Sequence, residues 1–498
     1  MFGNEKKEFG DYQTPLDFCH SVCKYLKKRG LVISPEAIVE PTCGIGNFIR
    51  ACLDEFSCHC VYGVEINPQY AEEAKQIAPA VHMVNQSVFD VNVRELVGKD
   101  HVLVIGNPPW ATNANLKDNL PQKVNFKGLS GIDALTGCSN FDICEYIILQ
   151  MIHEYRDTSS VICMLCKTSV ARNVIMEVSR SRTAYQTMEM LKFNSHKVFG
   201  ISAAACVFLI QLSGTPNKNG TVECQVKDFE SGQLEDTLFV KDGLLRSTAK
   251  TVDLSGQCQL VWRQGIKHDC GKVMELDIHG ETLVNKYNDK VNVEDDLVFP
   301  LAKSSHFKKP VITEFTKSVI VTQQKPRQDT SYIRNTLPLT WKYLQDHISQ
   351  FNNRKSVIYA NAPAFSIFGI GAYSFAPYKV GLSGFYKRPL FALLHASKPV
   401  MTDDTVYFLS FDDYDTAYCM MLLLNSRPVQ QFLLSVAFLD NKRPYTAKLL
   451  SHLDLQKCVD AVGFEELVTT EGELGLPSYV TAEKYDNLSN MICRCSPR

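Results

Sequence analysis

The sequence predicts an α/β protein of two domains: a doubly wound sheet flanked by helices in residues 1–245, and a mixed α/β or β-rich domain in residues 246–498. The length of 498 residues indicates more than one domain, since a domain commonly takes about 100–200 residues. Strand-like and helix-like segments alternate through the first 210 or so residues, which is typical of a parallel sheet. After about residue 260, short apolar runs are separated by Gly, Pro and basic residues, most clearly at 365–389.

Four short apolar runs in the first domain are each followed by a turn. The first leads into Glu-Pro-Thr-Cys-Gly-Ile-Gly-Asn at 40–47, and a helix is expected from Phe48. After the second, Asn67-Pro68 is expected to begin a helix, because Pro fits the first helical turn. The expected strands are 37–39, 61–64, 81–84 and 102–105.

The rest of this domain continues the alternation. Apolar residues at helical spacing predict a helix over 141–155. A strongly apolar run at 161–166 predicts a buried strand, which a helix follows. The remaining segments are expected as strands at 187–193 and 203–212 and as loops at 111–140, 213–222 and 241–258.

The charge is balanced over the whole chain but not along it. The formal net charge of −2 excludes a uniformly basic protein that coats nucleic acid. Residues 301–400, however, contain 14 Lys or Arg against three acids, a net charge of +11, which leaves −13 for the remainder. A bias over a hundred residues indicates a polyanionic partner for that segment. A solvated basic face is the plainer interpretation, but it suits shorter runs better.

The 18 cysteines are scattered, many in apolar surroundings, and are interpreted as reduced, buried thiols. Core packing explains Cys58-His59-Cys60, which is too tight for a zinc knuckle, and Cys163 with Cys166, which lack a second pair at a suitable distance. No apolar run is long enough for a membrane span, and the first residues lack the apolar stretch of a signal peptide. We therefore expect a cytoplasmic protein without a bound metal.

The turn at 40–46 has the composition of a ligand-binding loop between a strand and a helix. Small residues such as Gly44 and Gly46 let backbone amides approach a ligand, and the helix N-terminus adds partial positive charge. Glu65 ends the next strand about 20 residues later, where a carboxylate commonly accepts the hydroxyls of a ribose. Taken alone, these features are equally explained by a tight turn and a solvent-exposed acid.

Asn107-Pro108-Pro109-Trp110 follows the fourth strand, at the sheet edge where such folds bind ligands. The Asn107 side-chain oxygen and the Pro108 carbonyl are two acceptors on a rigid backbone, and neither proline has an N–H that competes for them. Acceptors placed in this way hold both hydrogens of a planar amino group and draw its lone pair out of conjugation. Trp110 offers a flat face on which the ring bearing that amine can stack.

These motifs, in this order, resemble those of the adenine-N6-specific DNA methyltransferases of restriction–modification systems, in the group whose cofactor motifs precede the catalytic motif. The resemblance covers nearly the whole chain. It implies a Rossmann-like methyltransferase domain followed by a target-recognition domain. It also implies transfer of a methyl group from S-adenosylmethionine to an adenine flipped out of double-stranded DNA, with Asn107, Pro108, Pro109 and Trp110 as catalytic residues.

Further family roles can be carried over onto matching positions. Tyr12-Gln13-Thr14-Pro15 resembles the motif that closes over the methionine part of the cofactor, and Ser139-Asn140-Phe141-Asp142 resembles the segment after the catalytic motif. Phe199 resembles the second aromatic that sandwiches the base with Trp110, although core packing explains it equally well. The implied cofactor-binding residues are Thr14, Pro15, Glu40, Pro41, Gly44, Gly46, Glu65, Ile66 and Asp90.

Two positions depart from the family pattern. Trp110 stands where Tyr or Phe is commoner. Ser87 stands where the family usually has the Asp that receives the adenine amine of the cofactor. Because Ser87 accepts only a weaker, uncharged hydrogen bond, Asp90 is the substitute that the sequence offers.

The second domain is expected to bind the DNA. Segments 262–269, 375–379 and 442–446 resemble target-recognition parts of the family. Basic residues would contact phosphates and polar side chains would read base edges. The residues chosen for phosphate contacts, each equally explained as a solvated charge, are Lys308, Lys309, Lys379, Lys387 and Arg388. If the protein belongs to a restriction system, we expect the restriction endonuclease on a separate polypeptide.

Two other functions remain open. Turns of the Asn-Pro-Pro-aromatic type also serve enzymes that methylate RNA bases or protein glutamine, but such enzymes usually carry small accessory domains, whereas roughly 240 residues follow the catalytic part here. A non-catalytic DNA-binding specificity protein with a methyltransferase-like fold is the alternative of another class. The intact motif at 107–110 and Glu65 argue against it.

Overall fold

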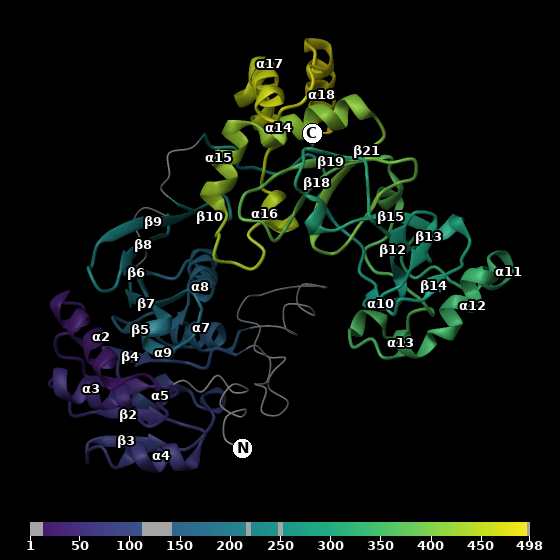
Figure 1. Cartoon of the computed structure of the whole chain (residues 1–498). Coiled ribbons are helices and arrows are strands. Elements are labelled where there is room, and N and C mark those ends of the chain that lie inside the picture. The colour runs from purple at the N-terminus through teal and green to yellow at the C-terminus, as the bar shows by residue number, and fades with distance from the viewer. Residues whose placement is uncertain (1–12, 112–141, 216–220, 248–251, 496–498) are drawn as a thin grey trace. The chain divides into compact units, whose positions relative to one another are not determined.

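The computed structural model describes residues 13–111, 142–215, 221–247 and 252–495. The chain divides into two compact units, Met1–Thr248 and Ala249–Arg498 (Figure 1). Tyr12 and residues 139–141, which resemble family motifs, lie outside the described residues. None of the described helices is long and apolar enough to cross a membrane.

A ten-stranded sheet forms the centre of the first unit, in the order β10-β9-β8-β6-β7-β5-β4-β1-β2-β3. Pairing is parallel from β3 through β5, whereas β7 runs antiparallel to its neighbours β5 and β6. The chain runs outward from β1 to β3 and returns to β4 beside β1, so the sheet has its switch point there. The strands are β1 (Ala37–Glu40), β2 (Val61–Val64), β3 (Val81–Val84), β4 (Val102–Gly106), β5 (Val161–Lys167), β6 (Tyr185–Phe193), β7 (Ala205–Leu212), β8 (Glu223–Asp228), β9 (Leu234–Lys241) and β10 (Leu244–Ser247).

Helices cover both faces of this sheet (Figure 1). α2 and α3 pack together on one face, where Leu103, Ile105 and Cys163 meet their apolar side chains. α7 and α8 pack together against β5 on the opposite face. The helices are α2 (Leu16–Lys28), α3 (Asn47–Glu55), α4 (Pro68–Lys75), the 3₁₀ helix η1 (Val88–Asp90), α5 (Val93–Val97), α7 (Ile143–Tyr155), α8 (Thr168–Ser181) and α9 (Ser195–Phe199).

The central strands are the ones that the sequence marks most clearly. β1 is buried along its whole length and β5 at all positions but the last, so both read as continuous apolar runs, as a strand covered on two faces does. The strands predicted at 61–64 and 81–84 are confirmed to the residue. Asn67 caps α4 by accepting from the backbone N–H groups of Gln69 and Tyr70, with Pro68 at the first helical position.

Two features of this sheet differ from the expectation. The sheet is mixed rather than parallel, since β7 is antiparallel, and apolar periodicity carries no information on strand direction. β8, β9 and β10 also extend the sheet beyond β6, where the sequence predicts no strands. Most of β9 is half-buried or exposed, so its apolar alternation is weak. The loop expected at 241–258 is therefore wrong over β10.

The cysteines discussed as metal ligands lie in or beside the core. Cys163 and Cys166 are fully buried in β5, and Cys58 is buried as well, which supports core packing for them. The residues that the structure describes include no group of three or more His, Cys, Asp or Glu side chains that could hold a metal ion.

The second unit is a mixed α/β domain with two sheets. One sheet has the order β11-β21-β18-β19-β16, and the other has the order β14-β13-β12-β17-β15-β20. The strands are β11 (Arg263–Gln264), β12 (Glu275–His279), β13 (Thr282–Val284), β14 (Lys290–Val291), β15 (Val298–Ala302), β16 (Val311–Ile312), β17 (Lys317–Ile320), β18 (Tyr378–Ser383), β19 (Ala392–Leu394), β20 (Met401–Thr402) and β21 (Val406–Phe411).

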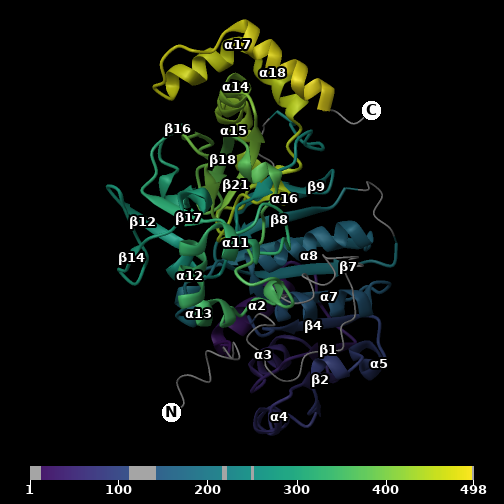
Figure 2. The same ribbon diagram turned by 90° about the vertical axis from the view of Figure 1, so that its right-hand side faces the viewer.

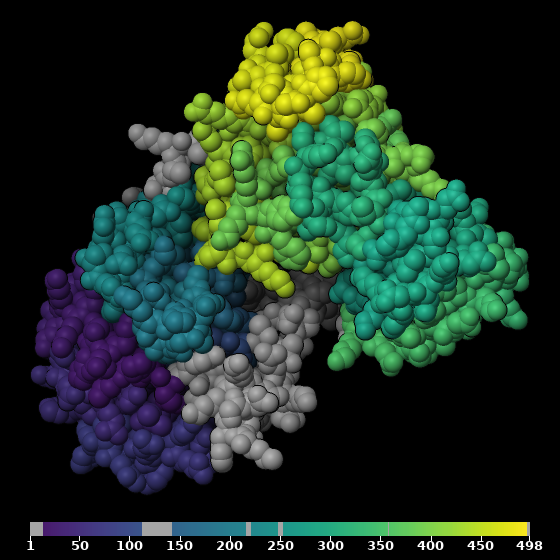
Figure 3. Space-filling model, in the orientation of Figure 1, coloured from purple at the N-terminus to yellow at the C-terminus, as the bar shows by residue number. Residues whose placement is uncertain are grey.

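Helices cluster towards the carboxyl end of this unit. α14 packs against α17 and α18, which lie across one end of the unit (Figure 2) and form its yellow surface in the space-filling view (Figure 3). The helices are α10 (Gly271–Met274), η3 (Asp295–Leu297), η4 (Ser304–His306), α11 (Tyr332–Thr336), α12 (Pro338–Asp346), α13 (Ile348–Asn352), η5 (Val357–Tyr359), η6 (Ala372–Phe375), α14 (Tyr414–Asn425), α15 (Arg427–Val436), α16 (Ala447–Leu450), α17 (Leu455–Glu473) and α18 (Ala482–Cys495).

Candidate active site

The turn after β1 requires glycine at two positions. Gly44 and Gly46 have φ angles of 53° and 81°, in the left-handed region that favours glycine. A Cβ at Gly44 would lie 2.6 Å from Gln13 Oε1, and a Cβ at Gly46 would lie 2.4 Å from Ile77 Cδ1. The turn is therefore closely packed on two sides, and it leads directly into α3.

Glu65, just after β2, holds this turn against the next one. Its Oε2 accepts the backbone N–H of Gly44 at 2.8 Å, and its Oε1 accepts the backbone N–H of Asn67 at 2.7 Å. Asn85 Nδ2 donates to the carbonyl oxygens of Glu65 and Ile66, at 2.8 and 3.1 Å. Only 9% of Glu65 is exposed, so its interpretation as a solvent-exposed acid is wrong.

The apolar side chain next to this carboxylate lies open to solvent. Ile66 is 54% exposed, although it follows the buried Glu65 directly. A buried acceptor and an exposed apolar surface side by side suit a ligand in which a hydroxyl-bearing sugar carries a flat ring.

The first described residues pack onto the same turn. Asn47 Nδ2 donates to the carbonyl oxygen of Thr14 at 2.8 Å, and Gln13 Oε1 accepts the backbone N–H of Ile45 at 3.3 Å. Thr14 is buried and Pro15 is exposed at the start of α2. Gln13 and Thr14 of the amino-terminal motif thus contact the glycine turn and the start of α3.

Glu40 occupies the junction between this turn and the end of β4. It is 3% exposed, and burial raises the pKa of its carboxyl well above the ordinary value. Its Oε2 is buried without a hydrogen-bond partner among the described residues, as is Thr42 Oγ1. A Cβ at Gly106 would lie 3.3 Å from Glu40 Cγ, so the two strand ends are in close contact there. Pro41 is buried between them.

The Asn-Pro-Pro-Trp turn follows β4 directly and is held from two sides. Trp110 Nε1 donates to the carbonyl oxygen of Leu165 in β5 at 3.4 Å. The backbone N–H of Ile143, at the start of α7, donates to the carbonyl oxygen of Ala111 at 3.0 Å. Asn107 is half-buried and the following Pro108 is buried. The turn therefore has a defined position at the edge of the sheet.

Trp110 and Phe199 contact each other. Their ring centroids are 5.7 Å apart, with an angle of 73° between the planes, and both rings pack partly against the core of this unit. Phe199 ends α9, shortly before β7. Since Ala205 at the start of β7 pairs with Lys167 at the end of β5, Phe199 and the Asn107 turn share one edge of the sheet. This contact fits both explanations of Phe199, stacking and core packing.

Ser87 and Asp90 occupy the two ends of η1. Ser87 Oγ accepts the backbone N–H of Phe89 at 3.3 Å and so caps this short helix. Asp90 is exposed. A role for either side chain in cofactor binding stays a prediction.

Of the five basic residues chosen for phosphate contacts, four are exposed: Lys308, Lys309, Lys387 and Arg388. The prediction for Lys379 is wrong. Lys379 is 1% exposed in β18, and its Nζ donates to the carbonyl oxygen of Ala376 at 2.9 Å. Burial lowers the pKa of its amine to about 7. Residues 379–383 of β18 are all buried, so this strand, which lies between β19 and β21, is covered on both faces and Lys379 lies inside.

Sequence reasoning quoted Gln13 and Asn47 within motifs without giving either a role of its own, and it did not single out Asn85. Gln13 and Asn47 connect the amino-terminal segment to the glycine turn, and Asn85 positions Glu65. Their signal is a polar residue at a strand or helix end, which is too common to single them out. Asp142 and Lys167 form a further pair near the Asn107 turn, with 3.0 Å between Oδ2 and Nζ.

Comparison with known proteins identifies relatives of this chain, although no family model matches the sequence. The chain is 36% identical to the Type II methyltransferase M.NspV of Nostoc sp. over 474 residues, which are 91% of this chain and 97% of that protein. It is 28% identical over 149 residues, 30% of this chain and 37% of that protein, to the Type II methyltransferase M.CvrRI of Paramecium bursaria Chlorella virus XZ-6E.

Among solved structures, the Type IIL restriction–modification enzyme MmeI, solved in complex with DNA, shares the fold. The TM-score is 0.53 at 12% identity, and the match covers 96% of this chain and 73% of that chain. The likeness to MmeI thus extends over both units, and the identity to M.NspV extends over nearly all of the two sequences. This chain belongs to the Type II methyltransferases.

Proposed function

We propose that the protein transfers a methyl group from S-adenosylmethionine to the N6 amine of an adenine that is flipped out of duplex DNA. The observation that carries this proposal is the position of the Asn107 turn. It lies at the switch point of the sheet, next to the glycine turn that follows β1. That both turns lie at one sheet edge supports a reaction between an amine held at the first and a cofactor held at the second.

The residues at the glycine turn fit S-adenosylmethionine. Ile66 offers an exposed apolar surface for the adenine ring, and the Glu65 carboxylate beside it suits the ribose hydroxyls. Glu40 Oε2 and Thr42 Oγ1, both buried without a partner among the described residues, leave polar capacity for the charged amino-acid end. When bound, the cofactor supplies an electrophilic methyl group on a sulfonium centre.

Asn107 and Pro108 hold and activate the amine. The Asn107 side-chain oxygen and the Pro108 carbonyl each accept one of the two amine hydrogens, which orients the nitrogen lone pair away from the ring. Because prolines follow Asn107, no backbone N–H competes for these acceptors within the turn. After transfer the extra proton leaves to solvent or neighbouring groups, so no covalent enzyme intermediate is required.

Trp110 and Phe199 stack the adenine. Flipping a base out of a duplex costs a few kcal/mol, which stacking on aromatic faces offsets at about 1–3 kcal/mol per base. Since the two rings now contact each other edge to face, one of them turns to admit a base between them. The carbonyl oxygen of Leu165 accepts from the indole nitrogen of Trp110, which is half-buried, and so fixes the edge of the ring.

Duplex DNA is the substrate that the second unit favours over RNA or protein. Residues 301–400 carry the net charge of +11, and four of the chosen cations are exposed there. The relative with a shared fold, MmeI, was solved in complex with DNA. A basic domain of this size suits the phosphates of a long duplex better than a glutamine side chain.

The test measures transfer of tritiated methyl groups from labelled S-adenosylmethionine to plasmid DNA, to ribosomal RNA and to protein. We expect label in DNA, recovered as N6-methyladenine after hydrolysis. Asn107→Ala is expected to abolish transfer and to bind S-adenosylhomocysteine with nearly unchanged affinity. The exposed Asn353→Ala serves as the matched amide control and should behave as the wild type.

Each other outcome has a definite meaning. Label in RNA or protein alone would identify the enzyme as a methyltransferase of that substrate. No label in any substrate would favour a non-catalytic DNA-binding protein. Full activity of Asn107→Ala would remove the role proposed for the turn.

A further inference from the structure

Arg443 in the second unit has a guanidinium group that is held in one orientation. It lies in the segment between α15 and α16. Its Nη1 donates to the carbonyl oxygen of Asp404 at 2.9 Å, and its Nη2 lies 3.3 Å from Asp404 Oδ2. The guanidinium carbon is 5.1 Å from the ring centroid of Phe385. An ion pair on one side and an aromatic ring on another restrict the rotamers of a normally flexible side chain.

The Arg443 guanidinium has N–H donors beyond those that its contacts with Asp404 and Tyr407 use. Arginine has five N–H groups, of which Asp404 takes two and Tyr407 also hydrogen-bonds the group. The side chain of Arg443 remains 28% exposed, and that of Asp404 remains 38% exposed. The remaining N–H groups can therefore reach a ligand without loss of the contacts that hold the side chain.

Cations and aromatic rings surround this arginine. Lys442 precedes it, is exposed, and has its Nζ 6.0 Å from the Phe385 ring centroid. Tyr445 Oη donates to the carbonyl oxygen of Lys387 at 2.9 Å, which connects the segment of Arg443 to the exposed pair Lys387 and Arg388. A held arginine near exposed cations has the layout of a site where phosphate contacts position the duplex and the arginine reads a base.

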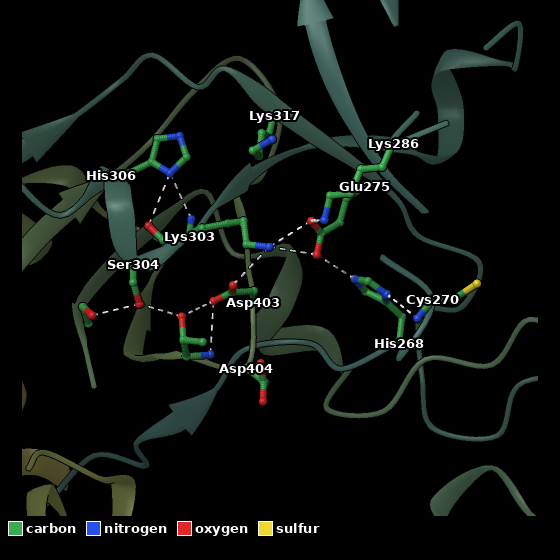
Figure 4. A network of polar contacts seen from close by, with 12 residues as sticks. His268, Cys270, Glu275, Lys286, Lys303, Ser304, His306, Lys317, Asp403 and Asp404 are labelled. Carbon is green, nitrogen blue, oxygen red and sulfur yellow. Dashed lines mark hydrogen bonds and ion pairs between the residues drawn. The ribbon is translucent and has the colours of Figure 1, made fainter. Parts of the chain in front are cut away.

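A buried polar network supports the turn that carries Asp404 (Figure 4). Lys303 is its centre, with its Nζ 2.8 Å from Glu275 Oε2 and 3.7 Å from Asp403 Oδ2. Asp403 Oδ1 accepts the backbone N–H of Thr405 at 3.1 Å and also accepts from the Thr405 hydroxyl. Since Asp404 stands between Asp403 and Thr405, these contacts fix the backbone from which its carboxylate projects.

The charges of this network are mutually compensated. Burial alone would raise the pKa of Glu275, but hydrogen bonds from His268, Lys286 and Lys303 lower it well below the ordinary value. The network borders a cavity of about 440 Å³, which Asp404 and Phe385 also line. Burying several charges contributes little net stability, so their retention fits a role in positioning.

We propose that Arg443 donates two N–H groups to the O6 and N7 atoms of a guanine in the recognition sequence, with Asp404 as its positioning residue. This inference rests on the proposed function, since it requires duplex DNA as the substrate. Two parallel N–H groups of arginine match the two acceptors that guanine presents in the major groove, and no other base presents the same pair. The exposed Lys387, Arg388 and Lys442 contact the phosphates on either side.

The first experiment maps methylated adenines by sequencing the DNA of a host that lacks other adenine methylation. The full chain should yield one recognition sequence that contains a G·C pair. Arg443→Ala and Arg443→Lys should both relax that sequence at a single G·C position, where preference for guanine falls about tenfold to a hundredfold. Arg443→Lys keeps the charge but loses the paired donors, so its relaxation separates base reading from phosphate binding. Asp404→Asn should relax the same position to a smaller extent.

Lys442→Ala is the matched control, because it removes a cation from the same segment and the same ring. It should keep the recognition sequence unchanged and lower the rate uniformly, with a weaker dependence on salt. An unrelaxed sequence in Arg443→Lys, or relaxation at a position without guanine, would overturn the inference. If the wild-type chain methylates no adenine in DNA, the proposed function itself fails, and that result is distinct from an unrelaxed sequence.

A DNA-binding experiment tests the contact between Arg443 and guanine N7 even for variants that have no methyltransferase activity. The probe is a duplex with the wild-type recognition sequence. In it, 7-deazaguanine replaces the guanine at the G·C position where the Arg443 variants relax the sequence. This base lacks the N7 acceptor. Wild-type protein should bind this duplex several-fold more weakly than the unmodified one. Arg443→Ala should bind the two duplexes equally, and an equal loss in both proteins would contradict the assigned contact.

Discussion

The carboxylate of Glu65 accepts the backbone N–H of Gly44 at 2.8 Å, so the residue after β2 holds the turn that follows β1. Gly44 occupies the left-handed region, at φ 53°, and its Cα faces the side chain of Gln13. Gln13 and Glu65, from two other segments of the chain, therefore both hold the turn at Gly44 and Ile45. The turn is arranged before any ligand arrives, which lowers the entropy that binding would otherwise have to overcome.

Glu65→Gln is expected to weaken cofactor binding about tenfold to a hundredfold. Both carboxylate oxygens accept backbone N–H groups, from Gly44 and Asn67, so the amide of glutamine must place an NH₂ group against one N–H donor. Loss of a hydrogen bond to a charged group costs about 1.5–3 kcal/mol. Isothermal titration calorimetry with S-adenosylhomocysteine measures this loss. Glu36→Gln, an exposed acid before β1, is the matched control, and equal affinities of the two variants would contradict the prediction.

Trp110 and Phe199 should contribute unequally to holding the flipped base. Trp110→Phe keeps a stacking face and loses only the contact to the Leu165 carbonyl, so activity should fall by less than tenfold. Trp110→Ala and Phe199→Ala should each lose about 1–3 kcal/mol of base binding. The fluorescence of 2-aminopurine at the target position, which rises when the base leaves the stack, reports the population of flipped base.

The same series separates stacking from core packing at Phe199. A side chain that only fills the core would lower the melting temperature of Phe199→Ala without changing the 2-aminopurine signal of the folded protein. Phe193→Ala provides the comparison, since Phe193 lies in the same aromatic cluster, 6.2 Å from Phe199 between ring centroids. A flipped-base signal that falls equally in both variants would argue against a specific role of Phe199.

Lys379→Met should stabilise the protein at neutral pH. The folded chain loses the Lys379 proton near pH 7, whereas the unfolded chain holds it up to about the ordinary value of 10.5. Because the unfolded state binds more protons between these values, the free energy of unfolding rises with pH across this window. At pH 7 the buried amine costs on the order of 4 kcal/mol, which an apolar side chain of similar length removes.

Thermal unfolding between pH 7 and pH 10 tests this prediction. The wild-type melting temperature should rise with pH relative to that of Lys379→Met, so that the two curves converge at the alkaline end. Lys387→Met, in an exposed position of the same basic segment, should follow the wild-type curve. Parallel curves for Lys379→Met and wild type would show that the amine is charged in the folded state.

The positions of the glycine turn and of the Asn107 turn could be predicted from the sequence because their signals are local. A buried strand appears in the sequence as a continuous apolar run, and the turn after it is marked by Gly or Pro. The strands at 61–64 and 81–84 were therefore predicted with the bounds that the structure has. The direction of β7 and the existence of β8 to β10 were not predictable in this way. They depend on pairing between distant segments, and β9 has too little apolar alternation to mark it.

In the second unit, the exposure and the contacts of individual side chains could not be predicted from the sequence either. Lys379 and Lys387 are both cations that follow a tyrosine in the basic segment, yet one is buried and the other exposed. Lys379 lies within β18, where residues 379–383 are all buried between two neighbouring strands, whereas Lys387 follows that strand. Arg443 and Asp404 are 39 positions apart, so no spacing rule connects them.

The carbonyl oxygen of Leu165 accepts from both Trp110 Nε1 and Cys144 Sγ, and Ala111 pairs with Ile143 through their backbone groups. Trp110 and the first turn of α7 are therefore fastened to the same carbonyl group of β5. A displacement of α7 along β5 would in consequence be transmitted to the indole ring of Trp110.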